Sequence, residues 1–221
     1  MLLDPDIREK FSQRVLTRLH EAFPDAVVGP RGRIADQTAD QYSPIDLRCM
    51  LPDEQFKDAL ARLPQVLASV EIVLSLRSEP THQNSDRRRI FYIRFGGLPL
   101  FWRVQLEVVA TSVADDPNYD NFNAAARGND WSLPESALWS AVDAIRSLAR
   151  GHDKEAHNQL RRAFQRINVP VLPKLTDREL LAKLLEEAPK LEPGQAAFAQ
   201  EIRQLASNTL AMARNRETEN K

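Results

Sequence analysis

The sequence predicts an α+β protein in which a mixed-sheet head is followed by an all-α helical bundle. Three observations lead to this prediction. Apolar residues alternate with polar ones along short segments before residue 111, which is typical of β-strands. Beyond residue 130, apolar residues recur at helical spacing instead. A polar segment rich in Asp and Asn, 115–130, separates the two parts, so we expect domains at 1–130 and 131–221.

The head is predicted to begin with a helix, because apolar residues recur at every fourth position from Ile7 to Phe23. Short strands are expected at 26–28, 45–51 and 70–76, with a helix after Pro52. A hairpin is predicted over 90–110, since Gly96 and Gly97 supply the positive φ angles of a tight turn. In this order the strands form one sheet with helices packed against it.

Four helices are predicted in the second half. The first runs from Pro134 to Arg150 and ends at Gly151, and a second follows over 152–167. Thr176 and Glu179 have the spacing of a capping box, which marks the start of a third helix. A last helix is expected over 194–213. Short connections between such helices predict a bundle.

Composition excludes several classes of protein. The 221 residues include 30 basic and 31 acidic side chains, a balance that argues against a protein that coats nucleic acid or anionic lipid. A single cysteine, Cys49, excludes a disulfide framework, and its place in an alternating strand predicts a buried, inert thiol. No apolar segment is long enough to span a bilayer, and the first residues lack the pattern of a signal peptide. We therefore expect a cytoplasmic protein with no membrane partner.

The most informative motif lies between the first two predicted strands and continues on a later strand. It consists of Gly29-Pro30, then Thr38-Ala39-Asp40-Gln41-Tyr42-Ser43-Pro44-Ile45-Asp46-Leu47, and finally Arg103-Val104-Gln105-Leu106. These segments resemble the signature of nucleotidyltransferases of the DNA polymerase beta superfamily, including the kanamycin and aminoglycoside nucleotidyltransferases. That signature has a Gly-Ser turn, two acids at i and i+2 on the second strand, and a third acid on a later strand.

The resemblance implies a site for Mg²⁺ and a nucleoside triphosphate. Carboxylates at i and i+2 on a strand share a face, so both can bind the cation, and the third acid completes the site. This sequence departs from the signature at three positions. Pro30 replaces the serine, Pro44 the first acid and Gln105 the third, so that Asp46 alone is retained.

Asp46 is therefore the candidate metal ligand, and Asp46 and Glu107 are the candidate catalytic residues. Glu107 lies two residues beyond Gln105, about 6.5–7 Å along the same face of the strand. Arg48 and Arg103 are predicted on that face too, where they could pair with the carboxylates and fill the cation site. The residues expected to contact a bound ligand are Gly29, Arg31, Ser43, Arg48, Arg103 and Gln105.

The basic run from Ser85 to Arg89 is interpreted as a solvated loop, with contact to a triphosphate or a nucleic-acid backbone as the alternative. The acidic segment around Asp115, Asp116 and Asp120 lacks the spacing of a calcium loop and is interpreted as a polar connector. Trp131 and Trp139 are expected to pack where the head meets the bundle.

Two functions follow from the resemblance and the departures. The first is a nucleotidyltransferase-fold protein with a degenerate metal site, which needs no cofactor and binds a nucleotide, another small molecule or a protein partner. The second is an active enzyme that uses Mg²⁺ and moves a nucleoside monophosphate from NTP to a hydroxyl, with Asp46 and Glu107 as rearranged ligands. The helical part is expected to offer a surface for a protein partner or a homodimer.

Overall fold

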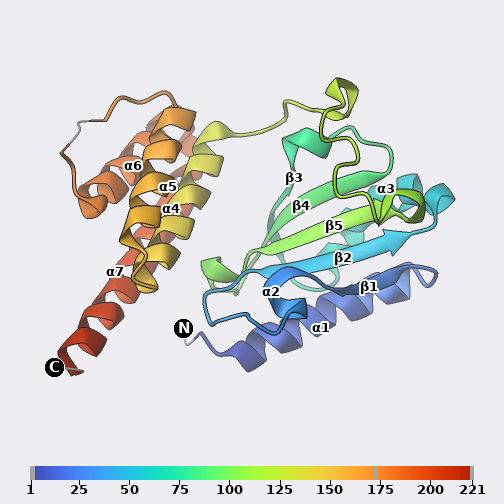
Figure 1. Cartoon of the computed structure of the whole chain (residues 1–221), viewed down its shortest axis with the longest axis horizontal. Helices are drawn as coiled ribbons and strands as arrows, with labels where there is room; N and C mark the ends of the chain where they lie inside the picture. Colours follow the sequence, from blue (N-terminus) through green and yellow to red (C-terminus); the bar gives the residue numbers. More distant parts are fainter. Residues whose placement is uncertain (1–2, 172–173, 220–221) are drawn as a thin grey trace. The chain divides into compact units, whose positions relative to one another are not determined.

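The computed structural model describes residues 3–171 and 174–219, with side chains described as far as 211. The chain divides into two compact units, Met1–Trp131 and Ser132–Lys221, and each is described on its own. The first unit contains a mixed sheet with helices, and the described residues of the second form helices and their connections (Figure 1). The predicted α+β fold class is therefore confirmed.

Five strands form one sheet in the order β1-β2-β5-β4-β3. Their bounds are β1 Val27–Pro30, β2 Ile45–Leu51, β3 Val73–Ser78, β4 Arg88–Phe95 and β5 Val104–Ala110. β2 and β5 run parallel, while the other neighbouring strands run antiparallel. β1 lies at an edge of the sheet, where Pro30 is tolerated because proline has no N–H to donate to a further strand.

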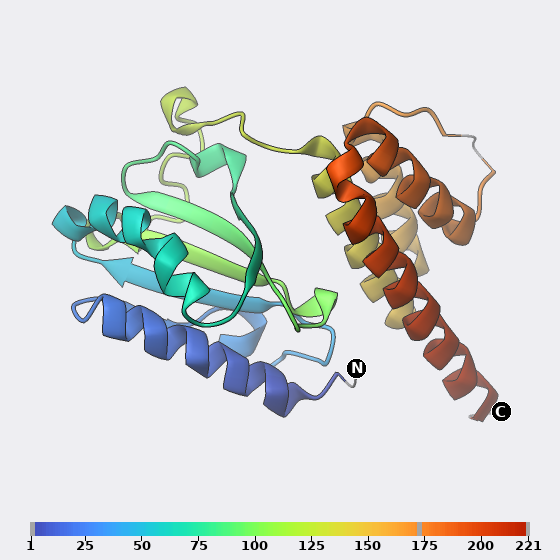
Figure 2. The same cartoon turned by 180° about the vertical axis from the view of Figure 1, so that it is seen from behind.

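One face of the sheet is apolar and packs against α1 (Pro5–Ala22) and α3 (Phe56–Ala68), which lie in front of it in Figure 2. Ile45, Leu47, Cys49 and Leu51 point to this face from β2, and all four are buried. Because side chains alternate along a strand, Asp46 and Arg48 must project from the opposite face. The apolar core thus determines which residues line the polar face.

Both strands of the hairpin, β4 and β5, begin at other residues than predicted. β4 begins at Arg88, two residues earlier than expected, so Arg88 belongs to the sheet and not to a loop. Leu100–Trp102 form a 3₁₀ turn in place of the start of a strand, and the Trp102 indole N–H donates to the Gln41 carbonyl oxygen at 2.9 Å. A short helix, α2 (Gly32–Ala35), lies in the connection between β1 and β2.

The helical unit contains α4 (Leu133–Ala149), α5 (Asp153–Arg166), α6 (Asp177–Leu191) and α7 (Ala196–Glu219), which pack against one another. The capping box predicted at Thr176 and Glu179 is present at the start of α6. Trp139 packs on Phe198 with ring centroids 4.9 Å apart, within this unit. None of the helices in residues 3–171 and 174–219 combines the length and hydropathy that a membrane-crossing segment requires.

Candidate functional site

The polar face of the sheet, which Figure 1 shows from the front, carries the strand residues of the motif. In the parallel ladder of β2 and β5, Asp46 is paired in register with Gln105, and Arg48 with Glu107. Register partners place their side chains on the same face, so the sheet brings these four residues together. Positions 46 and 105 therefore lie side by side on neighbouring strands, as the resemblance implies for its second and third acids.

Glu107 is the centre of a group of charged side chains. Its Oε2 lies 3.0 Å from Nη1 of Arg31 and 2.9 Å from Nε of Arg48, and its Oε1 lies 2.6 Å from Nη2 of Arg88. The Glu107 side chain is 2% exposed and that of Arg88 10%, whereas Arg31 and Arg48 are 34% and 36% exposed. We call these four residues the Glu107 cluster. Three guanidinium groups thus surround one buried carboxylate, and two of them reach solvent.

The Glu107 cluster also holds the segment that follows β5. Arg48 donates from Nη2 to the carbonyl oxygen of Ala114 at 2.6 Å. Arg88 donates from Nη1 to the carbonyl oxygens of Asp116 and Pro117 at 3.1 and 2.9 Å. Hydrogen bonds from a charged donor are stronger than neutral ones, so these contacts fix the segment firmly. Arg88 is therefore structural, while Arg31 and Arg48 are the members that a dissolved ligand can reach.

The glycine that shapes the connection after β1 is Gly32 and not Gly29. Gly29 lies within β1 opposite Arg48, and a Cβ added there would meet nothing within 4 Å. Gly32 has a φ of +55°, and a Cβ added there would lie 3.2 Å from Oδ2 of Asp46. The Gly29-Pro30 segment of the motif is therefore part of a strand, and the contact expected between Gly29 and a ligand stays a prediction. The positive φ and the close approach to the retained acid both occur at Gly32, for which glycine is suited because it lacks a Cβ.

Ser43, expected to contact a ligand, is fully buried and bonded within the chain. Its hydroxyl donates to Oδ1 of Asp40 at 2.7 Å and accepts from the Asp40 backbone N–H at 3.0 Å. The guanidinium of Arg8 donates to the carbonyl oxygens of both Asp40 and Ser43. Ser43 therefore stabilises the turn before β2, and the ligand contact expected of its buried hydroxyl stays a prediction.

Arg103 lies beside another part of the polar face. Its guanidinium stacks on the ring of Tyr92, 4.6 Å from the centroid. Tyr92 is the register partner of Gln105 on β4. Trp131 contacts the same tyrosine edge to face at 6.0 Å, and Arg77 stacks on Trp131 at 3.9 Å. Trp131 thus packs within the sheet unit.

These contacts decide whether the site fits Mg²⁺ with a triphosphate. Such a site needs carboxylates that converge on the cation. Pro44 and Gln105 provide none, and both oxygens of Glu107 face guanidinium groups. Among the described residues, no group of three or more His, Cys, Asp or Glu side chains is placed to hold a metal ion. The residues present do not fit the cation that the resemblance implies, while the role of Glu107 as a rearranged metal ligand stays a prediction that binding experiments must test.

The interpretation of the run after Ser85 as a solvated loop is wrong for Arg88, which is buried against Glu107. Arg87 is exposed and lies 3.4 Å from Asp53, and burial lowers the pKa of Arg89. The sequence analysis did not predict that Arg88 and Arg31 contact Glu107. The available signal was alternation, since positions 88, 90 and 92 share a face and Ile90 is the register partner of Glu107.

Cys49 and the acidic segment around Asp120 make contacts that stabilise the fold. Burial raises the pKa of the Cys49 thiol to about 12, which agrees with the prediction of an inert residue because the thiolate is the nucleophile. In the acidic segment, Asp120 accepts a hydrogen bond from the Ser85 hydroxyl at 2.5 Å, and the buried imidazole of His82 contacts the carbonyl oxygen of Tyr119 at 3.2 Å. This segment is thus joined to the start of β4 by side-chain contacts.

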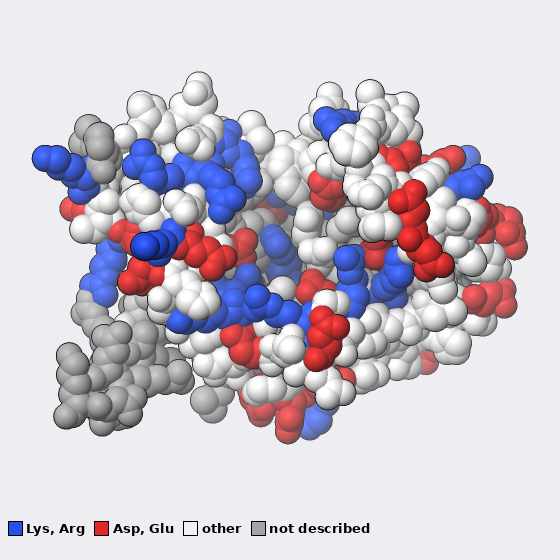
Figure 3. Space-filling model, viewed as in Figure 1, with Lys and Arg blue, Asp and Glu red and all other residues white. Residues whose placement is uncertain are grey.

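The distribution of surface charge shows how local the arginine excess is. Figure 3, in the orientation of Figure 1, shows basic and acidic side chains interspersed over the visible face. This agrees with the near-equal numbers of basic and acidic residues. The excess of guanidinium groups in the Glu107 cluster is thus a property of a few side chains.

No family model and no curated protein matches this chain. Among solved structures, a chain from the structure of the GLD-2/RNP-8 complex is 15% identical, with a TM-score of 0.32. The alignment covers 80% of this chain and 77% of the other. A likeness at that TM-score carries no argument, so the case for a function rests on the residues themselves.

Proposed function

We propose that this protein has a nucleotidyltransferase-type fold with a degenerate metal site, and that it binds a nucleotide or another phosphorylated small molecule without transferring it. The Glu107 cluster is the observation that carries this proposal, because guanidinium groups lie on the face where the resemblance implies acids and Mg²⁺. The register pair of Asp46 and Gln105 supports the assignment of the site.

An anionic ligand suits the site because cationic groups outnumber carboxylates there, even when Asp46 is counted with Glu107. The planar guanidinium of arginine donates paired hydrogen bonds that match phosphate oxygens. Arg31 and Arg48 are exposed enough to do so while they remain close to Glu107. In a metal-dependent enzyme the cation neutralises the phosphates, whereas here the two arginines would take over that role.

The alternative, an active Mg²⁺-dependent transferase, requires Glu107 to turn from the arginines towards a cation. Such a movement would separate it from Arg88, whose side chain is almost fully buried. Loss of one partner from a buried ion pair costs about 3–5 kcal/mol. This cost, together with the replacement of two acids by Pro44 and Gln105, favours the binding function.

The test is calorimetry of the full chain with ATP, GTP and inorganic tripolyphosphate, each with Mg²⁺ and with a chelator. We expect binding whose affinity changes by less than about threefold between the two conditions, because arginines supply the positive charge. A gain of about tenfold or more with Mg²⁺ would contradict the proposal, and so would the absence of binding by all three probes.

Two variants and a transfer assay complete the test. Arg48→Gln should weaken binding about tenfold or more, whereas Arg87→Gln, which changes an exposed arginine outside the Glu107 cluster, should have little effect. Labelled triphosphates with Mg²⁺ or Mn²⁺ should leave no label on a small molecule or protein acceptor. Label transfer that is lost in Asp46→Ala would establish the enzyme instead.

A further inference from the structure

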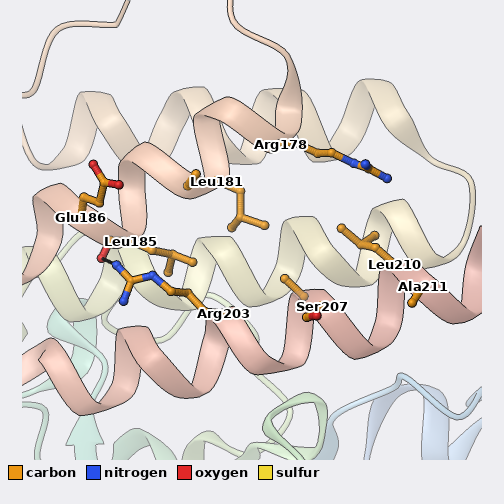
Figure 4. Close-up of a pocket in the computed structure, with 10 residues that line it drawn as sticks. Arg178, Leu181, Leu185, Glu186, Arg203, Ser207, Leu210 and Ala211 are labelled. Carbon is orange, nitrogen blue, oxygen red and sulfur yellow. Dashed lines mark hydrogen bonds between the residues drawn. The ribbon is translucent and has the colours of Figure 1, made fainter.

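We propose that the groove between α6 and α7 is a contact surface for a second copy of this chain. The groove is a cavity of about 450 Å³ on the helical unit (Figure 4). Each helix contributes five positions with the spacing i, i+3, i+4, i+7 and i+8, starting at Arg178 on α6 and at Arg203 on α7. These positions form one continuous face on each helix.

The shape of the groove suits a helix. Leu181 and Leu185 form a buried apolar floor, and the small side chains of Ala182 and Ser207, the middle lining position of each helix in sequence, are exposed. An amphipathic helix docks into such a groove through side chains at helical spacing, and small residues at the crossing point allow the two backbones to approach closely.

Charge identifies the occupant as another α6. Figure 4 shows Arg178 and Glu186 at opposite ends of the groove, and Ala182 lies four residues from each. The two charged positions are about 12 Å apart along the helix axis. If a second α6 lies antiparallel with its Ala182 opposite this one, Arg178 of each copy meets Glu186 of the other.

A twofold axis through Ala182 forms both ion pairs at once, which is the self-complementarity that a symmetric dimer requires. A parallel arrangement would instead place Arg178 beside Arg178 and Glu186 beside Glu186. The neighbouring arginine on α7 does not compete, because Nη2 of Arg203 donates to the carbonyl oxygen of Leu185 at 2.7 Å and is held against the α6 backbone. The geometry therefore points to an antiparallel α6 pair at the centre of a homodimer.

The first test is the mass of the full chain in solution, by size-exclusion chromatography with light scattering at protein concentrations from about 1 to 100 μM. We expect twice the chain mass of 25.1 kDa at the upper end. Ala182→Arg places a long charged side chain at the crossing point and should give a monomer, without loss of helix because arginine is a good helix former.

Charge reversal then tests the pairing itself. Arg178→Glu and Glu186→Arg should each weaken the dimer about tenfold or more, since each change sets two pairs of like charges against one another. The double variant Arg178→Glu/Glu186→Arg should restore the affinity of the original chain. The control is Arg162→Glu, an exposed arginine of α5 that does not line the groove.

Circular dichroism and thermal unfolding of each variant confirm that the helical unit stays folded. A chain that is monomeric at every concentration would overturn the proposal. So would a dimer that Ala182→Arg leaves intact, or a double variant as weak as the single ones.

Discussion

The substitution Glu107→Gln separates two roles that one residue could have on the polar face of the sheet. In the Glu107 cluster the carboxylate neutralises Arg31, Arg48 and Arg88, so its loss destabilises the fold and leaves the positive charge uncompensated. If Glu107 instead served as a metal ligand, the same change would abolish Mg²⁺-dependent nucleotide binding. The two roles thus predict opposite changes in affinity for a phosphorylated ligand.

The expected loss of stability follows from burial. Arg88 and Glu107 are 10% and 2% exposed, and removal of one partner from such a buried pair costs about 3–5 kcal/mol. The partly exposed Arg31 and Arg48 add little, because exposed pairs contribute about 0–1 kcal/mol. Because glutamine retains a hydrogen-bond acceptor, we expect the free energy of unfolding to fall by about 3 kcal/mol, the lower end of this range. At about 4 °C per kcal/mol for a unit of this size, the Tm falls by about 12 °C.

The expected gain in affinity follows from charge. With the carboxylate removed, a phosphate group approaches three guanidinium groups without repulsion from Glu107, and ATP without Mg²⁺ should bind about tenfold tighter or more. Phosphate should also raise the Tm of the variant more than that of the original chain, because an anion that binds the folded state stabilises it.

Urea unfolding followed by circular dichroism measures the stability, with the sheet unit and the helical unit fitted as separate transitions. Calorimetry with ATP and a chelator measures the affinity. Glu21→Gln is the matched control, because Glu21 forms an exposed pair with Arg18 at 2.7 Å and should cost less than about 1 kcal/mol. A Glu107→Gln variant that loses less than about 1 kcal/mol, or that loses ATP binding, would refute this reasoning.

Three further predictions concern other parts of the chain. Gly32→Ala should lower the free energy of unfolding by about 1–2 kcal/mol, because φ is +55° and the new Cβ meets Asp46, while Gly29→Ala should be nearly neutral in the same urea titration. Cys49 should react with a thiol reagent only after unfolding. Its pKa rises from 9.0 in the unfolded chain to about 12 in the folded chain, so between these pH values only the unfolded chain releases the thiol proton. The free energy of unfolding should therefore fall by about 1.4 kcal/mol per pH unit above pH 9, relative to that of Cys49→Ala. Thr176→Ala removes the α6 capping box and should cost about 1 kcal/mol, measured by thermal unfolding of the helical unit.

Periodicity predicted the fold class and most of the elements because burial decides both. The alternation of Ile45, Leu47, Cys49 and Leu51 places these residues on one face, and all four are buried against the helices. The start of the hairpin's second arm was not predictable in this way. Leu100–Trp102 are as apolar as a strand, yet they form a 3₁₀ turn in which Phe101 and Trp102 are buried and the Trp102 indole donates to the distant carbonyl oxygen of Gln41.

The candidate site was predictable only in part. Strand alternation correctly placed Arg48 on the face of Glu107, two residues beyond Asp46. The strand order β2-β5-β4 then brings Arg88 to the same carboxylate, and the connection after β1 brings Arg31 to it. Both contacts depend on which strands become neighbours, and local patterns in the sequence do not contain that information.

Under the proposed function, the replacement of acids by Pro44 and Gln105 and the presence of the Glu107 cluster are parts of one change in charge. Acids that bind Mg²⁺ create negative potential, and the cation then compensates both them and the phosphates. Under the proposed function, the face of this chain obtains its positive charge from the protein, and Arg31, Arg48 and Arg88 supply it. A buried guanidinium such as that of Arg88 needs a carboxylate partner, which Glu107 provides. Glu107 therefore compensates the charge of Arg88 within the folded sheet unit, and under the proposed function it has this role in place of binding a metal.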